Sequence, residues 1–83
     1  MLKIEVLGPG CPKCKLLEQN VRTAVEEMEL DAEVTKVSDI KEIASRGVLM
    51  TPGLVVDGKV VSSGHLLSVI QVKKRLEPWI VSN

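Results

Sequence analysis

The chain has 83 residues, of which 45% are hydrophobic, and eleven basic and eleven acidic side chains give a formal net charge of zero. This length predicts a single domain over residues 1–83, and the charge balance argues against binding to nucleic acid or to an anionic membrane surface. No apolar run approaches the roughly 20 residues that span a bilayer. Lys3 and Glu5 interrupt the first apolar stretch, unlike the core of a signal peptide, so we expect a cytoplasmic protein.

The first half of the chain predicts a strand, a helix and a second strand. Apolar and polar residues alternate over about residues 1–7, which is typical of a strand. After the break at Gly8-Pro9-Gly10, apolar residues from Pro12 to about Met28 fall on one helical stripe. Pro12 suits the first turn of that helix, where its missing N–H leaves no bond unmade. Alternation over residues 32–37 then predicts the second strand.

Turn and capping residues organise the next segment. Asp39 and Glu42 form an Asp-x-x-Glu pattern like a capping box, which predicts a short helix over about residues 40–46. Gly47 supplies the left-handed residue at which such a helix ends. Two β-branched runs then flank Asp57-Gly58, the strongest short-range signal for a β-hairpin.

A last helix follows the hairpin. Ser68 and Gln71 form a second capping box, which predicts a helix from Val69 to about Glu77 that Pro78 stops or kinks. The element order is therefore βαβαββα. The first two strands should be parallel with a right-handed crossover, and the hairpin adds an antiparallel pair. The sequence thus predicts an α/β fold with a four-stranded mixed sheet and helices on both of its faces.

The chemistry lies in the motif Cys11-Pro12-Lys13-Cys14. Cys11 falls where a loop enters a helix, and the helix N-terminus together with the charge of Lys13 favours a thiolate there. Cys11 is therefore the candidate nucleophile, and Cys14, one turn later and facing inward, is the candidate resolving cysteine. The motif predicts thiol–disulfide exchange, in which Cys11 attacks a partner disulfide and Cys14 then releases the partner.

Three segments together resemble the small thioredoxin-like redox-active disulfide proteins of archaea and bacteria, and the similarity extends to about Leu76. This resemblance implies the minimal thioredoxin fold. It also implies that Pro52 is a cis-proline packed beside the cysteines, and that the backbone of Thr51 pairs with an incoming peptide like an added strand. The segments are Gly8-Pro9-Gly10-Cys11-Pro12-Lys13-Cys14-Lys15, Val37-Ser38-Asp39-Ile40, and Thr51-Pro52-Gly53-Leu54-Val55-Val56-Asp57-Gly58-Lys59.

The motif also departs from its better-known relatives. Pro12-Lys13 stands where ordinary thioredoxins have Gly-Pro, and Gly10 stands where they usually have an aromatic residue. We expect Gly10, Thr51 and Pro52 to contact the substrate and Pro12 and Lys13 to tune the cysteines.

The resemblance further implies disulfide-containing proteins as substrates, a thioredoxin-reductase-like donor of electrons and a monomer. It implies no cofactor apart from the redox-active Cys11–Cys14 disulfide.

Glu5 lies six residues before Cys11, the spacing at which thioredoxins carry a buried acid. One interpretation is that burial raises the pKa of Glu5 and that its carboxylate serves Cys14 as a base. The other is an ordinary solvated carboxylate on the strand, because a shift of one residue turns the side chain to the other face of the sheet.

Two other functions compete with disulfide exchange. A Cys-x-x-Cys metal module could hold Cu(I) between two thiolates, or Zn with further ligands such as His65. Copper chaperones, however, have the order βαββαβ, whereas here a helix over about residues 40–46 separates the second and third strands, so we assign no metal ligand. A redox-regulated binding domain without turnover is the second alternative.

Overall fold

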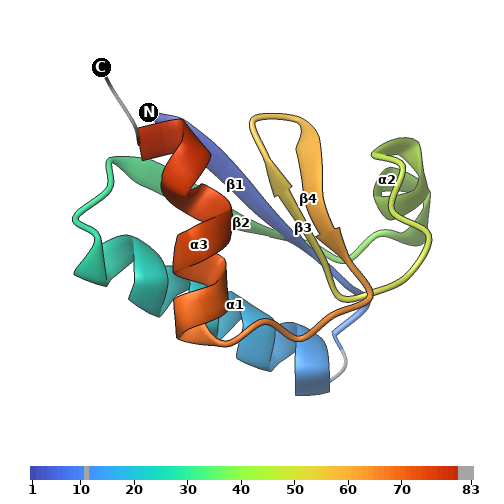
Figure 1. Cartoon of the computed structure of the whole chain (residues 1–83). Helices are drawn as coiled ribbons and strands as arrows, with labels where there is room; N and C mark the ends of the chain where they lie inside the picture. The colour runs from blue at the N-terminus through green and yellow to red at the C-terminus, as the bar shows by residue number, and fades with distance from the viewer. Residues whose placement is uncertain (11, 81–83) are drawn as a thin grey trace.

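The computed structural model describes residues 1–10 and 12–80, and its elements follow the order predicted from the sequence. Four strands and three helices alternate as βαβαββα (Figure 1). They are β1 (Leu2–Leu7), α1 (Pro12–Glu27), β2 (Ala32–Val37), α2 (Ile40–Ser45), β3 (Gly53–Val56), β4 (Lys59–Ser63) and α3 (Val69–Ile80).

The strands form one mixed sheet in the order β2-β1-β3-β4. β1 pairs in parallel with β2, from Leu2 opposite Ala32 to Leu7 opposite Val37. β3 runs antiparallel to both β1 and β4. β1 is therefore a central strand, which explains why its apolar residues are buried on both faces of the sheet.

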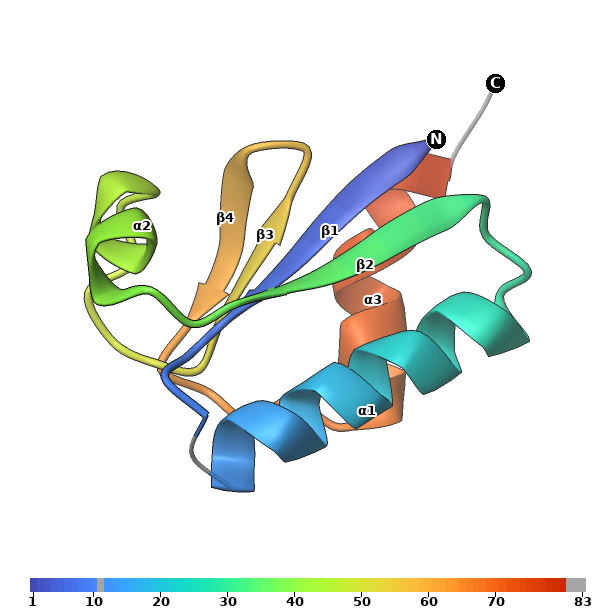
Figure 2. The same cartoon turned by 180° about the vertical axis from the view of Figure 1, so that it is seen from behind.

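Side-chain alternation along β1 and β3 divides the buried residues between two cores. Ile4 and Val6 lie in the main core, which α1 and α3 cover. Leu7 points to the opposite face, where Val55 and Ile43 of α2 complete a smaller core. Figure 1 shows α3 in front of the sheet, and Figure 2, from behind, shows β1 and β2 in front of α3. The predicted covering of both faces is confirmed.

The predicted caps and turn are present. The Oδ1 atom of Asp39 accepts from the backbone N–H of Lys41 at 2.8 Å and caps α2. The hairpin turn places both Asp57 and Gly58 at positive φ, +50° and +83°, as a type I′ turn requires. The capping box of α3 is reciprocal: Gln71 N–H donates to Ser68 Oγ at 3.2 Å, and Ser68 N–H donates to Gln71 Oε1 at 2.9 Å.

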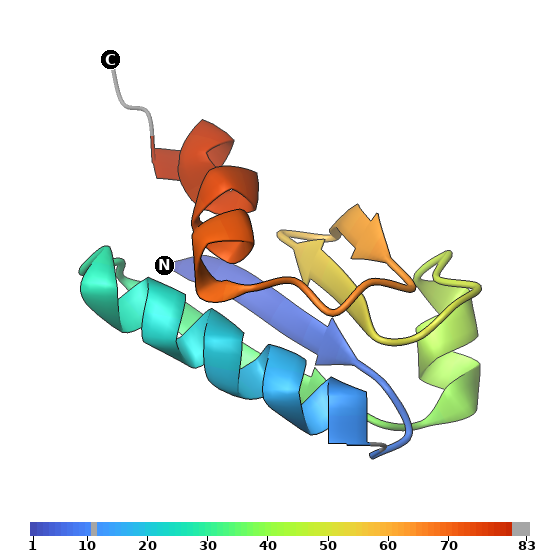
Figure 3. The same ribbon diagram turned by 60° about the horizontal axis from the view of Figure 1, so that its bottom comes forward.

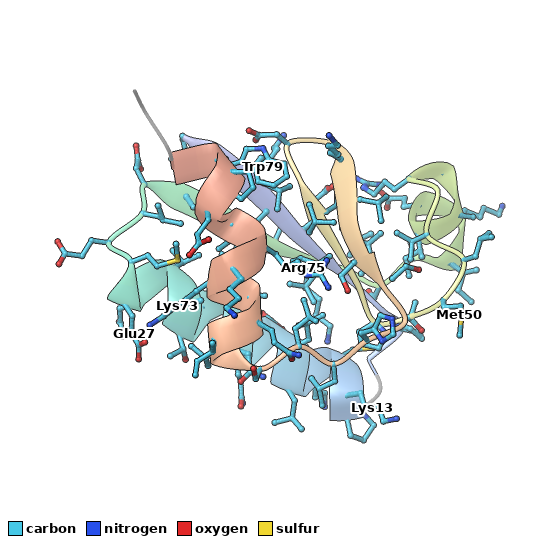
Figure 4. All side chains as sticks on the ribbon, viewed as in Figure 1. Lys13, Glu27, Met50, Lys73, Arg75 and Trp79 are labelled. Atoms are coloured by element: carbon cyan, nitrogen blue, oxygen red, sulfur yellow. The ribbon has the colours of Figure 1, made fainter. Side chains whose placement is uncertain are left out.

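The end of α3 corrects the sequence prediction. The helix does not stop near Glu77 but continues through Pro78 to Ile80. Pro78 has no N–H to donate to the carbonyl four residues earlier, so the last turn of α3 lacks one backbone hydrogen bond. Trp79, in that turn, packs against the main core, and Figure 4 shows its ring beside the sheet. This apolar contact keeps the last turn in place.

None of the helices within the described ranges is long and apolar enough to cross a membrane.

Candidate active site

Three segments meet at one end of the sheet. At this end lie the C-terminal end of β1, the start of α1 and the segment leading into β3 (Figure 3). They bring together residues from the cysteine motif and from the Thr51-Pro52 motif, which are separated in the sequence by more than thirty positions. The fold therefore assembles the two motifs that the sequence singled out.

Cys14 lies in the first turn of α1 and is buried, with 1% of its surface exposed. It belongs to the same buried stripe as Leu17 and Val21, which face the main core. The inward orientation predicted for Cys14 is confirmed. Cys11, the predicted nucleophile, lies outside the described residues, so its role and its pairing with Cys14 stay predictions.

Gly8 is the residue that brings Cys14 and Thr51 together. It is buried, directly after β1, and a Cβ atom placed on it would lie 2.1 Å from Cys14 Sγ, 2.8 Å from Cys14 Cβ and 3.9 Å from Thr51 Cβ. In the sequence, Gly8 stands out only as part of the break after a strand. One signal in the sequence could have indicated this contact. Gly8 has no side chain and stands where the first strand leads into the cysteine motif.

The Thr51–Pro52 peptide bond is cis, the isomer that the family resemblance implies. Pro52 is buried and Thr51 is exposed. The end of β4 holds this segment, because Gly64 N–H donates to the Pro52 carbonyl at 2.9 Å and Ser63 Oγ donates to the Met50 carbonyl at 3.1 Å. Thr51 is thereby presented to solvent on a fixed loop.

The residues flanking the cysteines are exposed or half-buried. Gly10 has a φ of +96°, a backbone conformation that side chains rarely adopt. This conformation favours glycine, the residue that stands here. Pro12 is the first residue of α1, as predicted. Lys13 is exposed at the start of that helix and points away from the fold (Figure 4).

An apolar hollow of about 320 Å³ lies next to Thr51. It opens on the face that carries α2, where the side chains of Ile40 and Leu49 are exposed. Its lining consists of Pro9, Ile40, Ile43, Ala44, Val48, Leu49 and Thr51.

Glu5 is neither the base for Cys14 nor an ordinary solvated carboxylate. Arg46 binds it with two hydrogen bonds of 2.8 Å, Nε to Oε1 and Nη2 to Oε2. The hydrogen bond and the positive charge of Arg46 outweigh partial burial and lower the pKa of Glu5 from its ordinary 4.5. The interpretation with a raised pKa is therefore wrong. That interpretation assumed that the Glu5 carboxyl is buried without a cation beside it. In addition, Glu5 points away from the α1 face of the sheet, because it alternates with Ile4 and Val6.

The structure gives the metal alternative no support within its described residues. No group of three or more His, Cys, Asp and Glu side chains that could hold a metal ion occurs in residues 1–10 and 12–80. His65 is exposed. The presence of α2 between β2 and β3 also departs from the order βαββαβ of copper chaperones.

Comparison with known proteins agrees with this geometry. Residues 2–77 match the family model described as thioredoxin domain. A thioredoxin of Methanocaldococcus jannaschii is 42% identical over 80 residues, covering 96% of this chain and 92% of the relative. A thioredoxin of Methanothermobacter thermautotrophicus is 41% identical over 76 residues, covering 92% of this chain and 99% of the relative. The chain therefore belongs to the thioredoxin domain family, whose activity is thiol–disulfide oxidoreduction.

Proposed function

We propose that this protein reduces disulfide bonds in other proteins through the dithiol of Cys11 and Cys14. The observation that carries the proposal is the meeting of Cys14 and Thr51 on either side of Gly8. A buried sulfur and, beside it, an exposed loop residue whose backbone is open to an incoming segment are the two parts that a protein substrate needs. Family membership supports the same reaction.

The proposed reaction has two exchanges. The Cys11 thiolate attacks one sulfur of the substrate disulfide, and the other substrate sulfur leaves as a thiolate. Cys14 then attacks Cys11, forming the Cys11–Cys14 disulfide and releasing the second substrate thiolate. The two electrons gained by the substrate come from the two cysteines, so the step needs no bound cofactor.

The sequence position of Cys11 supports its role as the nucleophile. It directly precedes Pro12, the first residue of α1, and a helix N-terminus stabilises a thiolate. The burial of Cys14 supports the second role, because a sulfur that substrate cannot reach attacks only within the mixed disulfide. Glu5 has no part in this proposal.

Substrate docking is assigned to Gly10, Thr51 and Pro52. Thr51 is exposed beside the end of β1, and its backbone can pair with an extended segment of the substrate. Pro12 and Lys13 occupy the positions between the cysteines. We assign them the tuning of the dithiol rather than contact with the reacting bond.

The setting of the reaction is proposed from its chemistry. A dithiol that acts as a reductant needs a compartment that keeps thiols reduced, which favours the cytoplasm. A thioredoxin-reductase-like enzyme is the proposed electron donor, and residues 1–83 are proposed to act as one monomeric domain. Size-exclusion chromatography with light scattering checks the monomer.

The experiment is reduction of a model disulfide protein by the wild type and by Cys11→Ser and Cys14→Ser. We expect turnover only by the wild type. Cys14→Ser should accumulate a mixed disulfide with the substrate, whereas Cys11→Ser should form none. Cys14→Ala provides a second variant without the sulfur, because a serine hydroxyl at a buried position can destabilise the fold.

The same preparation separates the competing functions. Metal bound to the wild type is measured after purification in reductant. Thr23→Ser, at an exposed position later in α1, is purified in the same way and should match the wild type in turnover and metal content. A wild type that reduces no disulfide, or that carries stoichiometric copper or zinc, would disprove the proposal. An oxidisable cysteine pair with negligible turnover would instead indicate a redox-regulated binding domain.

A further inference from the structure

We propose that Gly8 is a positioning residue for the resolving cysteine, and that its bare Cα atom determines where the sulfur of Cys14 sits. The inference rests on the proposed function, since it concerns the second exchange. Gly8 itself contacts no substrate. It acts through Cys14, and its identity determines how fast a mixed disulfide is resolved.

The geometry leaves no room for a side chain at this position. An added Cβ would lie 2.1 Å from Cys14 Sγ, more than an ångström inside ordinary van der Waals contact, which begins at 3.4 Å. It would also lie 2.8 Å from Cys14 Cβ. The Sγ atom can turn about one bond, but the Cβ atom is fixed to the helix backbone. The overlap with the sulfur is far larger than the overlap with the Cβ atom, so the main displacement falls on the sulfur.

Gly8 cannot retreat to relieve the collision. Its N–H donates to the Val37 carbonyl at 2.9 Å, which extends the pairing of β1 with β2. The preceding residue, Leu7, is fully buried in the smaller core. On the other side, α1 is held by Leu17 and Val21, both fully buried in the main core. Rotation about the Cα–Cβ bond of Cys14 moves the sulfur without moving either backbone, so we expect the sulfur to move.

A moved sulfur affects one step of the reaction. In that step Cys14 loses its thiol proton to solvent and its sulfur attacks Cys11. The Cys14–Cys11 bond forms, the bond between Cys11 and the substrate breaks, and the substrate sulfur leaves with the electron pair. Displacement of a reacting group by about 1 Å can slow such a step by up to about 100-fold. The first attack, by Cys11 on the substrate, does not use the Cys14 sulfur.

The test measures the two exchanges separately in Gly8→Ala. The reduced protein is mixed with a model disulfide protein, quenched with acid at intervals and analysed by mass spectrometry for the mixed disulfide. We expect the mixed disulfide to form at close to the wild-type rate and to resolve about 10- to 100-fold more slowly. A change in overall stability alone would not produce this split.

Gly53→Ala is the matched control. A Cβ at Gly53 would lie 2.7 Å from Val48 Cγ1, and its three nearest side-chain atoms all belong to Val48. This variant crowds the smaller core with the same change of residue, and the resolving rate within its mixed disulfide should equal that of the wild type. An equal slowing in Gly53→Ala would overturn the inference, because crowding anywhere near the sheet would then suffice.

The remaining outcomes separate the inference from the proposed function. Absence of turnover in the wild type contradicts the function itself. Wild-type turnover together with unchanged resolution in Gly8→Ala contradicts only the role of Gly8.

If Gly8→Ala does not fold, the double variant Gly8→Ala/Cys14→Ala removes the Sγ atom from the collision. Folding of the double variant supports the contact with the sulfur. Its failure to fold overturns the inference, because the obstacle is then not the sulfur.

Discussion

At the scale of single residues, Glu5 shows how a partner distant in the sequence reverses the chemistry of a carboxyl group. Arg46 lies 41 residues away and binds both carboxylate oxygens at 2.8 Å. The predicted raised pKa required a buried acid without a cation. No local pattern around Glu5 predicts its ion pair with Arg46, because the contact depends on where the end of α2 lies relative to the sheet.

Arg46→Gln is expected to raise the pKa of Glu5. The variant removes the hydrogen bond and the charge that lower this pKa, and it leaves the partial burial that raises it. NMR titration of the Glu5 side-chain carboxyl carbon measures the change. Lys41→Gln, at an exposed position of α2, is the control and should leave the pKa of Glu5 where it is in the wild type.

The same pair predicts an acid-dependent loss of stability. Because the folded pKa of Glu5 is lowered, its contribution is fully present above the unfolded value near 4.5 and is lost as the pH falls through the lower folded value. The free energy of unfolding of the wild type should therefore fall more steeply below about pH 5 than that of Glu5→Gln. Urea denaturation at a series of pH values tests this. Parallel pH profiles for the two proteins would show that the pair does not contribute.

Cys14 and Gly8, which meet beyond the end of β1, were predictable to different degrees. Cys14 is recognisable from its motif, and its burial follows from its place on the apolar stripe of α1. Gly8 was not recognised, because its role lies in an interatomic distance between β1 and α1. Sequence patterns predict which face a residue takes, but not how closely two backbones approach.

At the scale of elements, the termini of α3 depend on different forces. Its start rests on local hydrogen bonds, the reciprocal pair between Ser68 and Gln71, and these could be predicted from four consecutive residues. Its end rests on Trp79 packing against the main core, a contact that local propensity does not contain. The sequence therefore predicts the first residue of α3 correctly, but the end it predicts, near Glu77, comes too early.

Ser68→Ala should lower the stability of the protein by about 1 kcal/mol, because the N–H of Gln71 loses its acceptor. For a domain of this size such a loss corresponds to a fall in Tm of about 4–8 °C. Thermal unfolding followed by circular dichroism measures it. Ser68→Asp retains an acceptor oxygen at the cap and should unfold close to the wild-type temperature. Equal Tm values for all three proteins would show that the cap does not stabilise α3.

At the scale of the whole molecule, the two faces of the sheet are unequally covered. Among the residues that the structure describes, the main core joins β1 and β3 to two helices through ten buried residues, whereas the smaller core has five. α2 has six residues and contributes only Ile43 to its core. The predicted element order implies helices on both faces of the sheet. The difference in size between the two cores depends on side-chain packing, which the element order alone does not specify.

This asymmetry predicts that α2 opens before the rest of the protein unfolds. Amides of β1, which lies between both cores, and of α1 around Val21 should exchange with solvent only through global unfolding. Amides of α2 should exchange at a lower free energy and with little dependence on denaturant, because opening a six-residue helix exposes little surface. Native-state hydrogen exchange read by NMR measures both sets.

The link between Glu5 and Arg46 makes that prediction sharper. Arg46 follows α2 directly, and its bonds to Glu5 tie the end of this helix to the central strand. Glu5→Gln should therefore speed hydrogen exchange in α2. In this variant, as in the wild type, α2 amides should exchange at a lower free energy than amides that exchange only through global unfolding. If α2 amides instead exchange as slowly as those of β1 in the wild type, the smaller core unfolds together with the main one. The segment beside Thr51 would then be as rigid as the sheet that carries Gly8.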